Sequence, residues 1–389
     1  MRLKDVCEFI VDCPHSTAKD EGQGYPLIRT PNIGKGRFNL EGVHRVSEDV
    51  YRKRNLRATP QDNDLIFARE APAGNVAIIK NGEKYCLGQR TVLIRPNCEY
   101  VYPDFLTYYL LAPQQQYGLL GMANGATVAH VNLPVIRELE ITLPPIEIQR
   151  RIANILSAYD DLIENNQKQI KLLEEAAQRL YKEWFVDLRF PGYENTKIVD
   201  GVPEGWTRPS MNDIAEYLNG YAFKPEDWRE KGKPIIKIKE MNEGITTATP
   251  RNDGSTIPEK YNITAGDILF SWSATLTAMI WASEDGLLNQ HLFKVTPNNG
   301  VCREYVLQSI LKTLDEFKNL TTGSTMKHIQ RGKLKEVFVN LPSQEVMEKF
   351  SSIVEVYREK ILILQKQNIF LQEARDRLLP KLMSGELEV

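Results

Sequence analysis

Residues 125–130, which read GATVAH, recur as residues 323–328, which read GSTMKH. The offset of 198 residues (328 minus 130) then holds without a gap as far as Arg179 and Leu180, which match Arg377 and Leu378. Two such periods nearly fill the 389 residues of the chain. The sequence therefore predicts a tandem duplication and excludes a solenoid of many repeats.

Each repeat begins with a mixed, loop-rich part in which Gly, Pro and Asn interrupt short apolar runs. Here the repeats match at drifting offsets, as expected where loops differ in length, and the matching segments are 5–9 with 213–217, 26–29 with 234–237, 64–67 with 267–270, and 87–90 with 288–291. The predicted strands of a curled sheet are 64–67, 75–80, 91–96, 235–238, 267–270 and 292–296, and the predicted short helices are 103–111 and 304–314. This part is therefore predicted to be α+β.

A long helix follows this part in each repeat. Apolar residues recur there at alternating spacings of three and four, with charges between them, which is typical of a coiled coil. The residues predicted to pair the helices are Ile152, Tyr159, Leu173, Leu180, Phe350, Tyr357, Leu364, Leu371 and Leu378. We expect the two helices to pair with each other in antiparallel, because the second sheet-rich part lies between them in sequence. Asn166, a polar residue on the same lattice, either fixes the register or is a solvated position beside Asn165.

The composition limits the classes of protein to which the chain can belong. With 42% apolar and 26% charged residues it is not disordered, and no apolar run approaches the roughly 20 residues of a spanning helix. The charged start, MRLKDV, argues against a secretory signal. The formal charge of −2 excludes a uniformly basic nucleic-acid coat but allows a local basic surface. Five scattered Cys and five scattered His lack metal-ligand spacing, so we expect a cytoplasmic protein without disulfides and without a metal site.

Four motifs occur in a fixed order on this duplicated frame. LPPIEIQ (143–149) opens the first long helix, WFVD (184–187) closes it, VPEGW (202–206) enters the second repeat, and LLPKLMSGEL (378–387) ends the chain. Over essentially its whole length the chain resembles the specificity subunit of type I restriction–modification enzymes. One departure is Ser343, which replaces the second proline of the pair Pro144 and Pro145 and predicts a looser start for the second long helix.

The resemblance implies an α+β fold with two homologous, sheet-containing target-recognition domains and two long antiparallel coiled-coil helices, related by a pseudo-two-fold axis. The segments it implies are a first recognition domain at 1–144, a central long helix at 145–185, a linker at 186–208, a second recognition domain at 209–342, a distal long helix at 343–383 and a C-terminal tail at 384–389. Such a subunit is non-catalytic and binds double-stranded DNA at a bipartite asymmetric site, with one half-site per domain and a spacer set by the helices.

The partners implied by the resemblance are two modification (methyltransferase) subunits and, through them, restriction (motor-nuclease) subunits. S-adenosylmethionine, ATP and Mg are then expected on those partners and no cofactor on this chain. In agreement, the sequence contains neither the Asn-Pro-Pro-aromatic motif of a methyltransferase nor a Walker-type Gly-Lys-Ser/Thr loop. We therefore assign no catalytic residue.

Candidate DNA contacts are side chains that offer paired donors to base edges or positive charge to phosphates. In loop 68–75 Arg69 is expected to reach a guanine, and the equivalent second loop contains Trp272; the alternatives are that Arg69 pairs with Glu70 and that Trp272 lies in the core. The loops around His130 and its counterpart either hold phosphates or cap the junction of sheet part and helix. The full set is Arg29, Asn32, Arg69, Asn75, Arg90, Thr127, His130, Lys237, Lys239, Ser271, Trp272, Ser273, His291, Thr325, Lys327 and His328.

Three other functions remain open on the sequence alone. The chain could be the DNA-reading subunit of a type II-like modification enzyme. It could be a coiled-coil scaffold whose sheet-rich parts bind protein. A standalone nuclease is the third alternative, and purified chain that cut DNA with magnesium alone would establish it.

Overall fold

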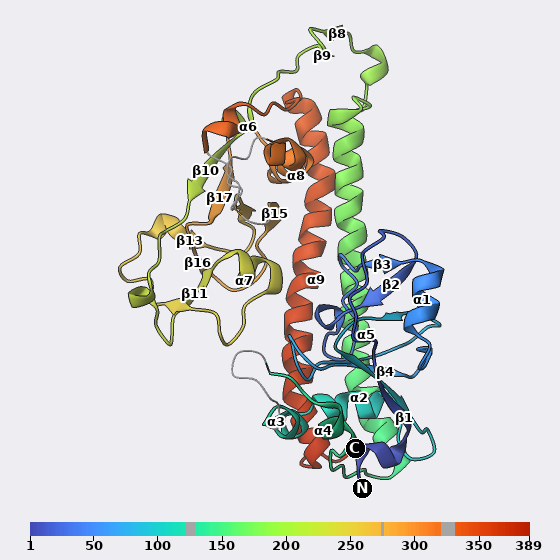
Figure 1. The fold of residues 1–389 in the computed structure, drawn as a ribbon. Coiled ribbons are helices and arrows are strands. Elements are labelled where there is room, and N and C mark those ends of the chain that lie inside the picture. Colours follow the sequence, from blue (N-terminus) through green and yellow to red (C-terminus); the bar gives the residue numbers. More distant parts are fainter. Residues whose placement is uncertain (122–128, 274–275, 320–330) are drawn as a thin grey trace. The chain divides into compact units, whose positions relative to one another are not determined.

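The computed structural model describes residues 1–121, 129–273, 276–319 and 331–389 (Figure 1). It consists of two compact units: unit 1 contains Met1–Glu164 and Ile369–Val389, and unit 2 contains Asn165–Asn368. Each unit combines one sheet-rich part, called head 1 (residues 1–144) or head 2 (residues 209–342), with a stretch of each long helix. The limits of the recognition domains stay a prediction, because both long helices contribute to both units.

Head 1 contains two small sheets. In the four-stranded sheet the order is β1-β7-β4-β5 and all neighbours are antiparallel; in the three-stranded sheet the order is β3-β2-β6, with β2 antiparallel to β3 and parallel to β6. The strands are β1 (Cys7–Asp12), β2 (Tyr25–Ile28), β3 (Arg45–Val46), β4 (Leu65–Ala68), β5 (Val76–Ile78), β6 (Cys86–Leu87) and β7 (Thr91–Pro96). Its described helices include α1 (Glu48–Arg54), α2 (Pro103–Leu111), α3 (Pro113–Gly121) and α4 (Leu133–Arg137).

Head 2 has the same topology. Its antiparallel sheet has the order β10-β17-β14-β15, and β12-β11-β16 corresponds to β3-β2-β6, with β13 added at the edge. The strands are β10 (Ala215–Asn219), β11 (Lys233–Ile236), β12 (Arg251–Asn252), β13 (Asn262–Ile263), β14 (Ile268–Ser271), β15 (Thr277–Ile280), β16 (Gly286–Leu288) and β17 (Leu292–Pro297), and the helices are α6 (Met211–Ile214), α7 (Ile238–Glu243) and α8 (Arg303–Asn319). The matched sheet-part segments lie on equivalent strands or directly next to them, so the tandem duplication is confirmed.

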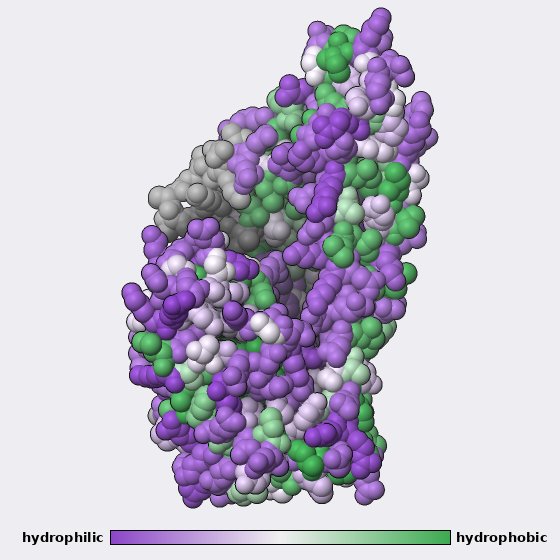
Figure 2. Space-filling view, turned by 90° about the vertical axis from the view of Figure 1, so that its right-hand side faces the viewer, coloured by the Kyte–Doolittle hydropathy of each residue, from purple (hydrophilic) through white to green (hydrophobic). Residues whose placement is uncertain are grey.

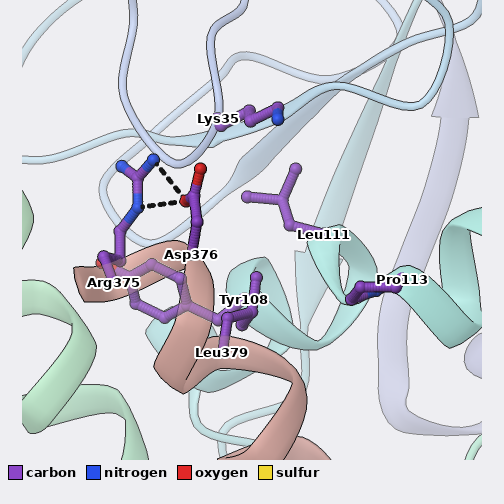
Figure 3. A pocket seen from close by; sticks show the side chains of 7 residues that line it. All are labelled: Lys35, Tyr108, Leu111, Pro113, Arg375, Asp376 and Leu379. Carbon is purple, nitrogen blue, oxygen red and sulfur yellow. Dashed lines mark hydrogen bonds and ion pairs between the residues drawn. The ribbon is translucent and has the colours of Figure 1, made fainter. Parts of the chain in front are cut away.

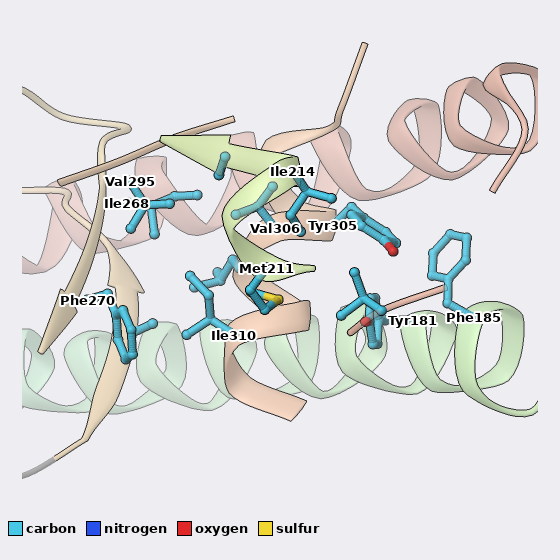
Figure 4. Packing of buried hydrophobic residues seen from close by; sticks show 14 of the residues in the cluster. Tyr181, Phe185, Met211, Ile214, Ile268, Phe270, Val295, Tyr305, Val306 and Ile310 are labelled. Atoms are coloured by element: carbon cyan, nitrogen blue, oxygen red, sulfur yellow. The ribbon is translucent and has the colours of Figure 1, made fainter. Parts of the chain in front are cut away.

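The central strands β4 and β14 are buried on both faces, which explains their continuous apolar runs. In β4, Phe67 joins the main core of unit 1, while Ile66 faces a second core beneath the smaller sheet. In β14, Phe270 joins the main core of unit 2 (Figure 4), and Leu269 faces the smaller core. Each four-stranded sheet is therefore fixed between two cores, and the loops at its strand ends start from rigid positions.

The long helices are α5 (Ile146–Tyr181), which continues as a π-helical turn at Lys182–Val186, and α9 (Gln344–Ser384). The first residue of α9 is equivalent to the first residue of α5 at the offset of 198, so Ser343 in place of a proline does not shift the helix start. The predicted looser start is not found: the backbone N–H of Met347 donates to the carbonyl of Ser343 at 3.0 Å. In the described part of the chain no helix combines the length and the apolar character needed to cross a membrane.

Within each unit α5 and α9 run antiparallel, as predicted. In unit 1 Arg375 of α9 binds Asp160 of α5, and in unit 2 the ring of Phe350 lies 5.9 Å from that of Trp184. Of the predicted pairing residues, Ile152, Phe350 and Leu364 are buried, and Tyr159, Leu173, Leu180, Tyr357, Leu371 and Leu378 are half-buried.

Asn166 is not solvated. Its side chain is 3% exposed, and its Nδ2 donates to Oδ1 of Asn368 at 2.9 Å. The interpretation of Asn166 as a solvated position is therefore wrong. It failed because its partner, Asn368, lies on the other helix and is not one of the apolar residues from which the pairing of that helix was predicted.

Candidate nucleic-acid interface

In head 1, Arg69 follows β4 directly and lies at the centre of a polar network. Its Nε donates to the carbonyl of Val131 at 2.9 Å, its Nη1 to Oδ2 of Asp12 at 3.0 Å, and its Nη2 to Nε2 of His130 at 2.7 Å. The residue is only 8% exposed. The guanidinium is therefore already bound and is not free, contrary to expectation, and it pairs with Asp12 in place of Glu70. A contact of Arg69 with DNA stays a prediction.

Glu70 extends this network outward. Its carboxylate contacts Nδ1 of His130 and Nη1 of Arg90. Because an arginine can only donate, the Nε2 of His130 accepts from Arg69 and its Nδ1 carries the proton shared with Glu70. Arg90 is the exposed end of the network: its side chain is 54% accessible and its backbone has a positive φ of 64°. This network thus presents the guanidinium of Arg90 to solvent, held by the half-buried carboxylate of Glu70.

Head 2 has a polar network at the same place with other side chains. Trp272 follows β14, and its Nε1 donates to Oδ1 of Asn219 at 3.2 Å. The hydroxyl of Ser273 lies 3.4 Å from Nδ1 of His291, and the buried hydroxyl of Ser271 donates to the carbonyl of Ser273 at 3.1 Å. The Trp272 ring packs against the core of unit 2 and keeps a polar contact, so it corresponds neither to a free reader nor to a fully buried residue.

The ladder registers make these two networks equivalent, position by position. The aligned pairs are Asp12 with Val92 and Ala68 with Thr91 in head 1, and Asn219 with Phe293 and Ser271 with Leu292 in head 2. The equivalent residues are therefore Asp12 and Asn219, Arg69 and Trp272, Glu70 and Ser273, and Arg90 and His291. We call these positions, together with His130 in head 1, the strand-end cluster of each head.

The other predicted DNA contacts within the described residues lie outside these clusters. Asn32 is buried and structural, since it accepts from the backbone N–H of Arg29 at 3.1 Å and donates to the carbonyl of Asn39 at 3.1 Å. The Nδ2 of Asn75 donates to the carbonyl of Ile33 at 2.8 Å. The ammonium of Lys237 lies over the Trp228 ring and Lys239 is exposed, whereas Thr127, Thr325, Lys327 and His328 lie outside the described residues.

The family model for the type I restriction modification DNA specificity domain matches residues 1–175 and again residues 203–373. The chain belongs to this family. A type I restriction enzyme specificity subunit, MjaIX, from Methanocaldococcus jannaschii is 28% identical over 413 residues, which span 100% of this chain and 93% of that protein. The HindI specificity subunit from Haemophilus influenzae is 24% identical over 396 aligned residues. The match covers 83% of this chain and 86% of that protein. The crystal structure of an S subunit from M. genitalium has the same fold, with a TM-score of 0.53 and 17% identity over 98% of this chain and 95% of that one.

In this specificity subunit a buried polar cluster fastens each head to a long helix. In unit 1 Asp160 of α5 accepts from the hydroxyl of Tyr108 in α2 at 2.6 Å and from Nη1 of Arg375 at 2.5 Å. Burial alone would lower the pKa of Arg375, but the Asp160 carboxylate raises it above its usual value, and Arg375 also binds Asp376 beside a cavity of about 150 Å³ (Figure 3). Burial and Asp160 likewise raise the pKa of Tyr108.

In unit 2 the equivalent of Asp160 is Arg358, at the offset of 198. Its Nε and Nη2 donate to Oε2 of Glu304 in α8 at 3.1 and 2.5 Å. The same position of the two long helices thus has opposite charge: Asp160 binds a hydroxyl of head 1 and an arginine of α9, whereas Arg358 binds a carboxylate of head 2. The two junctions are not interchangeable.

Sequence reasoning missed three members of the clusters, Asp12, Glu70 and Asn219, as functional positions. The duplication itself contains a signal for them, since each lies at or next to the end of a strand whose counterpart can be aligned. The missing information was the strand register, including the irregularity in β1 near Cys7 that shifts Asp12 into line with Asn219. Among the described residues no three His, Cys, Asp or Glu side chains come together as a metal site.

Proposed function

We propose that this specificity subunit is non-catalytic, acts in the cytoplasm and binds a bipartite asymmetric DNA site, with one half-site read by each strand-end cluster. The observation that carries the proposal is the difference between the clusters on an equivalent backbone frame. Head 1 offers the donor of Arg90 and the half-buried carboxylates of Asp12 and Glu70, whereas head 2 offers the indole of Trp272 and the imidazole of His291. Two unlike sets of donors and acceptors suit two different base sequences.

The long helices support the second part of the proposal, the docking of two modification subunits. In unit 2 Leu172 of α5, and Val356 and Ile363 of α9, are each more than half exposed, and the last two are one heptad apart. On the face shown in Figure 2, hydrophobic residues gather in several places on a mostly hydrophilic surface. Apolar residues at heptad spacing on an exposed helix suit a partner helix. Restriction subunits would join through the modification subunits, and S-adenosylmethionine, ATP and Mg would be bound on those partners.

Methylome sequencing of a host that carries this chain with its modification subunit tests the proposal. The expected result is one methylated motif made of two different half-sites separated by a gap of constant length. A host that carries the modification subunit without this chain is the control and should lack the motif. A continuous site with no gap would contradict the assignment of one half-site to each head.

The alternatives give other outcomes. A neighbouring gene for a modification enzyme without a motor-nuclease subunit would favour the type II-like reader. A mobility-shift assay with no preference for any duplex, even with partner subunits, would favour the protein scaffold.

A further inference from the structure

The two long helices pair in one constant register. Two contacts define this register, Trp184 with Phe350 and Asn166 with Asn368. From the first contact to the second the chain moves 18 residues along the first helix (184 minus 166) and 18 residues along the second (368 minus 350). Asp160 with Arg375 follows this register to within one residue in unit 1, and the burial of Ile152 with Leu382 in one core agrees with it. Each step along α5 is therefore matched by an equal step back along α9.

The duplication gives each helix a competing partner, which is the same helix of a second copy of the chain. At the offset of 198, Ile170 is the equivalent of Asn368 and Leu364 is the equivalent of Asn166. If α5 paired with α5 of a second copy in this register, Asn166 would face Ile170 of that copy. If α9 paired with α9, Asn368 would face Leu364 of that copy. Each symmetric pair would bury two amides without their partners, and both would lose a hydrogen bond.

The charged pair distinguishes the same alternatives. The equivalent of Arg375 is Ala177, so Asp160 would meet an alanine in an α5–α5 pair. The equivalent of Asp160 is Arg358, so Arg375 would meet a second arginine in an α9–α9 pair. A buried charge left unpaired or placed against a like charge is strongly unfavourable.

The apolar residues of the helix pair do not make this distinction. In an α5–α5 pair Ile152 would face Trp184, and in an α9–α9 pair Leu382 would face Phe350, so these layers would stay apolar. A polar residue within an otherwise apolar helix pair is the feature that selects register and partner in coiled coils. We propose that the Asn166–Asn368 and Asp160–Arg375 pairs make each long helix select the other half of its own chain and reject a second copy of the same half.

Cutting the folded chain between its halves tests this proposal without any DNA. The turn between β8 (Ile198–Val199) and β9 (Val202–Pro203) is exposed, so a protease site inserted between Asp200 and Gly201 allows cleavage there with every residue of the protein still present. The cut protein is unfolded in denaturant, refolded and examined by native mass spectrometry. We expect one-to-one pairs of first and second halves and almost no pairs of identical halves.

The informative variant is Asn166→Leu with Asn368→Ile. Each asparagine is replaced by the type of residue found at the equivalent position of the other repeat. Pairs of identical halves should increase at least about tenfold, because the loss of a buried hydrogen-bond partner no longer opposes them. The matched control adds Ile170→Asn and Leu364→Asn, which moves the amide pair to the equivalent layer and should restore the wild-type distribution. The uncut variants are checked by circular dichroism.

Two results would overturn the proposal: abundant pairs of identical halves from the cut wild type, or no increase in the amide variant. If that variant does not refold, Arg375→Ala tests the charged layer alone. It removes the meeting of two arginines, so pairs of two second halves should increase while pairs of two first halves change less. An unchanged distribution there would also contradict the proposal.

Discussion

The two heads share a backbone plan and differ in what they place at the ends of the same strands. In head 1 the strand-end cluster is ionic, with Arg69 and Arg90 matched by Asp12 and Glu70. In head 2 the equivalent positions have Asn, Trp, Ser and His, and none of their described contacts is an ion pair. The contacts between positions are kept, since position 69 binds position 12 just as 272 binds 219. Duplication has thus preserved which positions touch while replacing their chemistry.

This difference separates two tasks within each cluster. A buried residue that follows the central strand holds the loops together, and a more exposed residue that precedes the next strand faces solvent. In head 1 these are Arg69, which is buried, and Arg90, which is exposed; in head 2 the equivalent residues are Trp272 and His291, which are both half-buried. If the assignment is right, substitutions at the first kind of position change stability and substitutions at the second kind change DNA selectivity.

The largest expected effect comes from Arg69→Ala. It removes the arginine that binds the Asp12 carboxylate and leaves that carboxylate only its contact with His15, and breaking a buried pair from one side costs about 3–5 kcal/mol. Trp272→Ala removes one hydrogen bond and a half-buried ring, so we expect a loss of about 2 kcal/mol in head 2.

Hydrogen exchange distinguishes the two heads in this experiment. Arg69→Ala should accelerate exchange in β1, β4 and β7 and leave β10, β14 and β17 unchanged, and Trp272→Ala should do the reverse. Equal acceleration of both heads by either variant would contradict the view that each strand-end cluster stabilises only its own head.

Arg90→Ala and His291→Ala form the next comparison. If Arg90 donates to a base edge, its loss lowers the discrimination between bases at one position of one half-site by about 1–3 kcal/mol, or roughly fivefold to 150-fold. His291→Ala should lower the discrimination between bases at one position of the other half-site and leave the first half-site unchanged. Methylome sequencing of each variant with its modification subunit measures both. Uniformly weaker methylation of all sites, with a reduced salt dependence of binding, would instead assign these residues to phosphates.

Much of the fold follows from local sequence signals. The apolar runs predicted the buried strands β4, β7, β14 and β17, and the helix predicted at 103–111 has the bounds of α2. The two-residue strands β3, β6, β12 and β13 have no periodicity to detect, and the parallel pairing of β2 with β6 joins segments far apart in sequence.

The site was harder to predict because its partners are distant in sequence. Arg69 was chosen for its chemistry and its loop, but Asp12, which holds it, is 57 positions away. The pattern of Asn166 was ambiguous for the same reason, since Asn368 lies 202 positions away. An isolated polar residue on an apolar lattice indicates burial or exposure only when its partner is known.

The smallest effect compares the carboxylates that precede the central strands. Asp64 is bound by Nε and Nη2 of Arg95 at 2.8 and 2.7 Å, whereas Asp267 is bound by Lys294 at 2.8 Å and is less buried. Burial raises the pKa of Asp64, in spite of Arg95, which lowers it. The folded protein therefore holds a proton on Asp64 more tightly than the unfolded chain does.

The unfolding free energy that Asp64 contributes should consequently rise as the pH falls from neutrality through this raised pKa toward the ordinary value of an aspartate. Asp64→Asn cannot titrate and lacks this rise. In urea denaturation between pH 7 and 4, the difference between wild type and Asp64→Asn should change in favour of wild type by at most about 1.4 kcal/mol per pH unit. A change in the opposite direction would mean that Arg95 outweighs burial, so that the ion pair itself stabilises head 1.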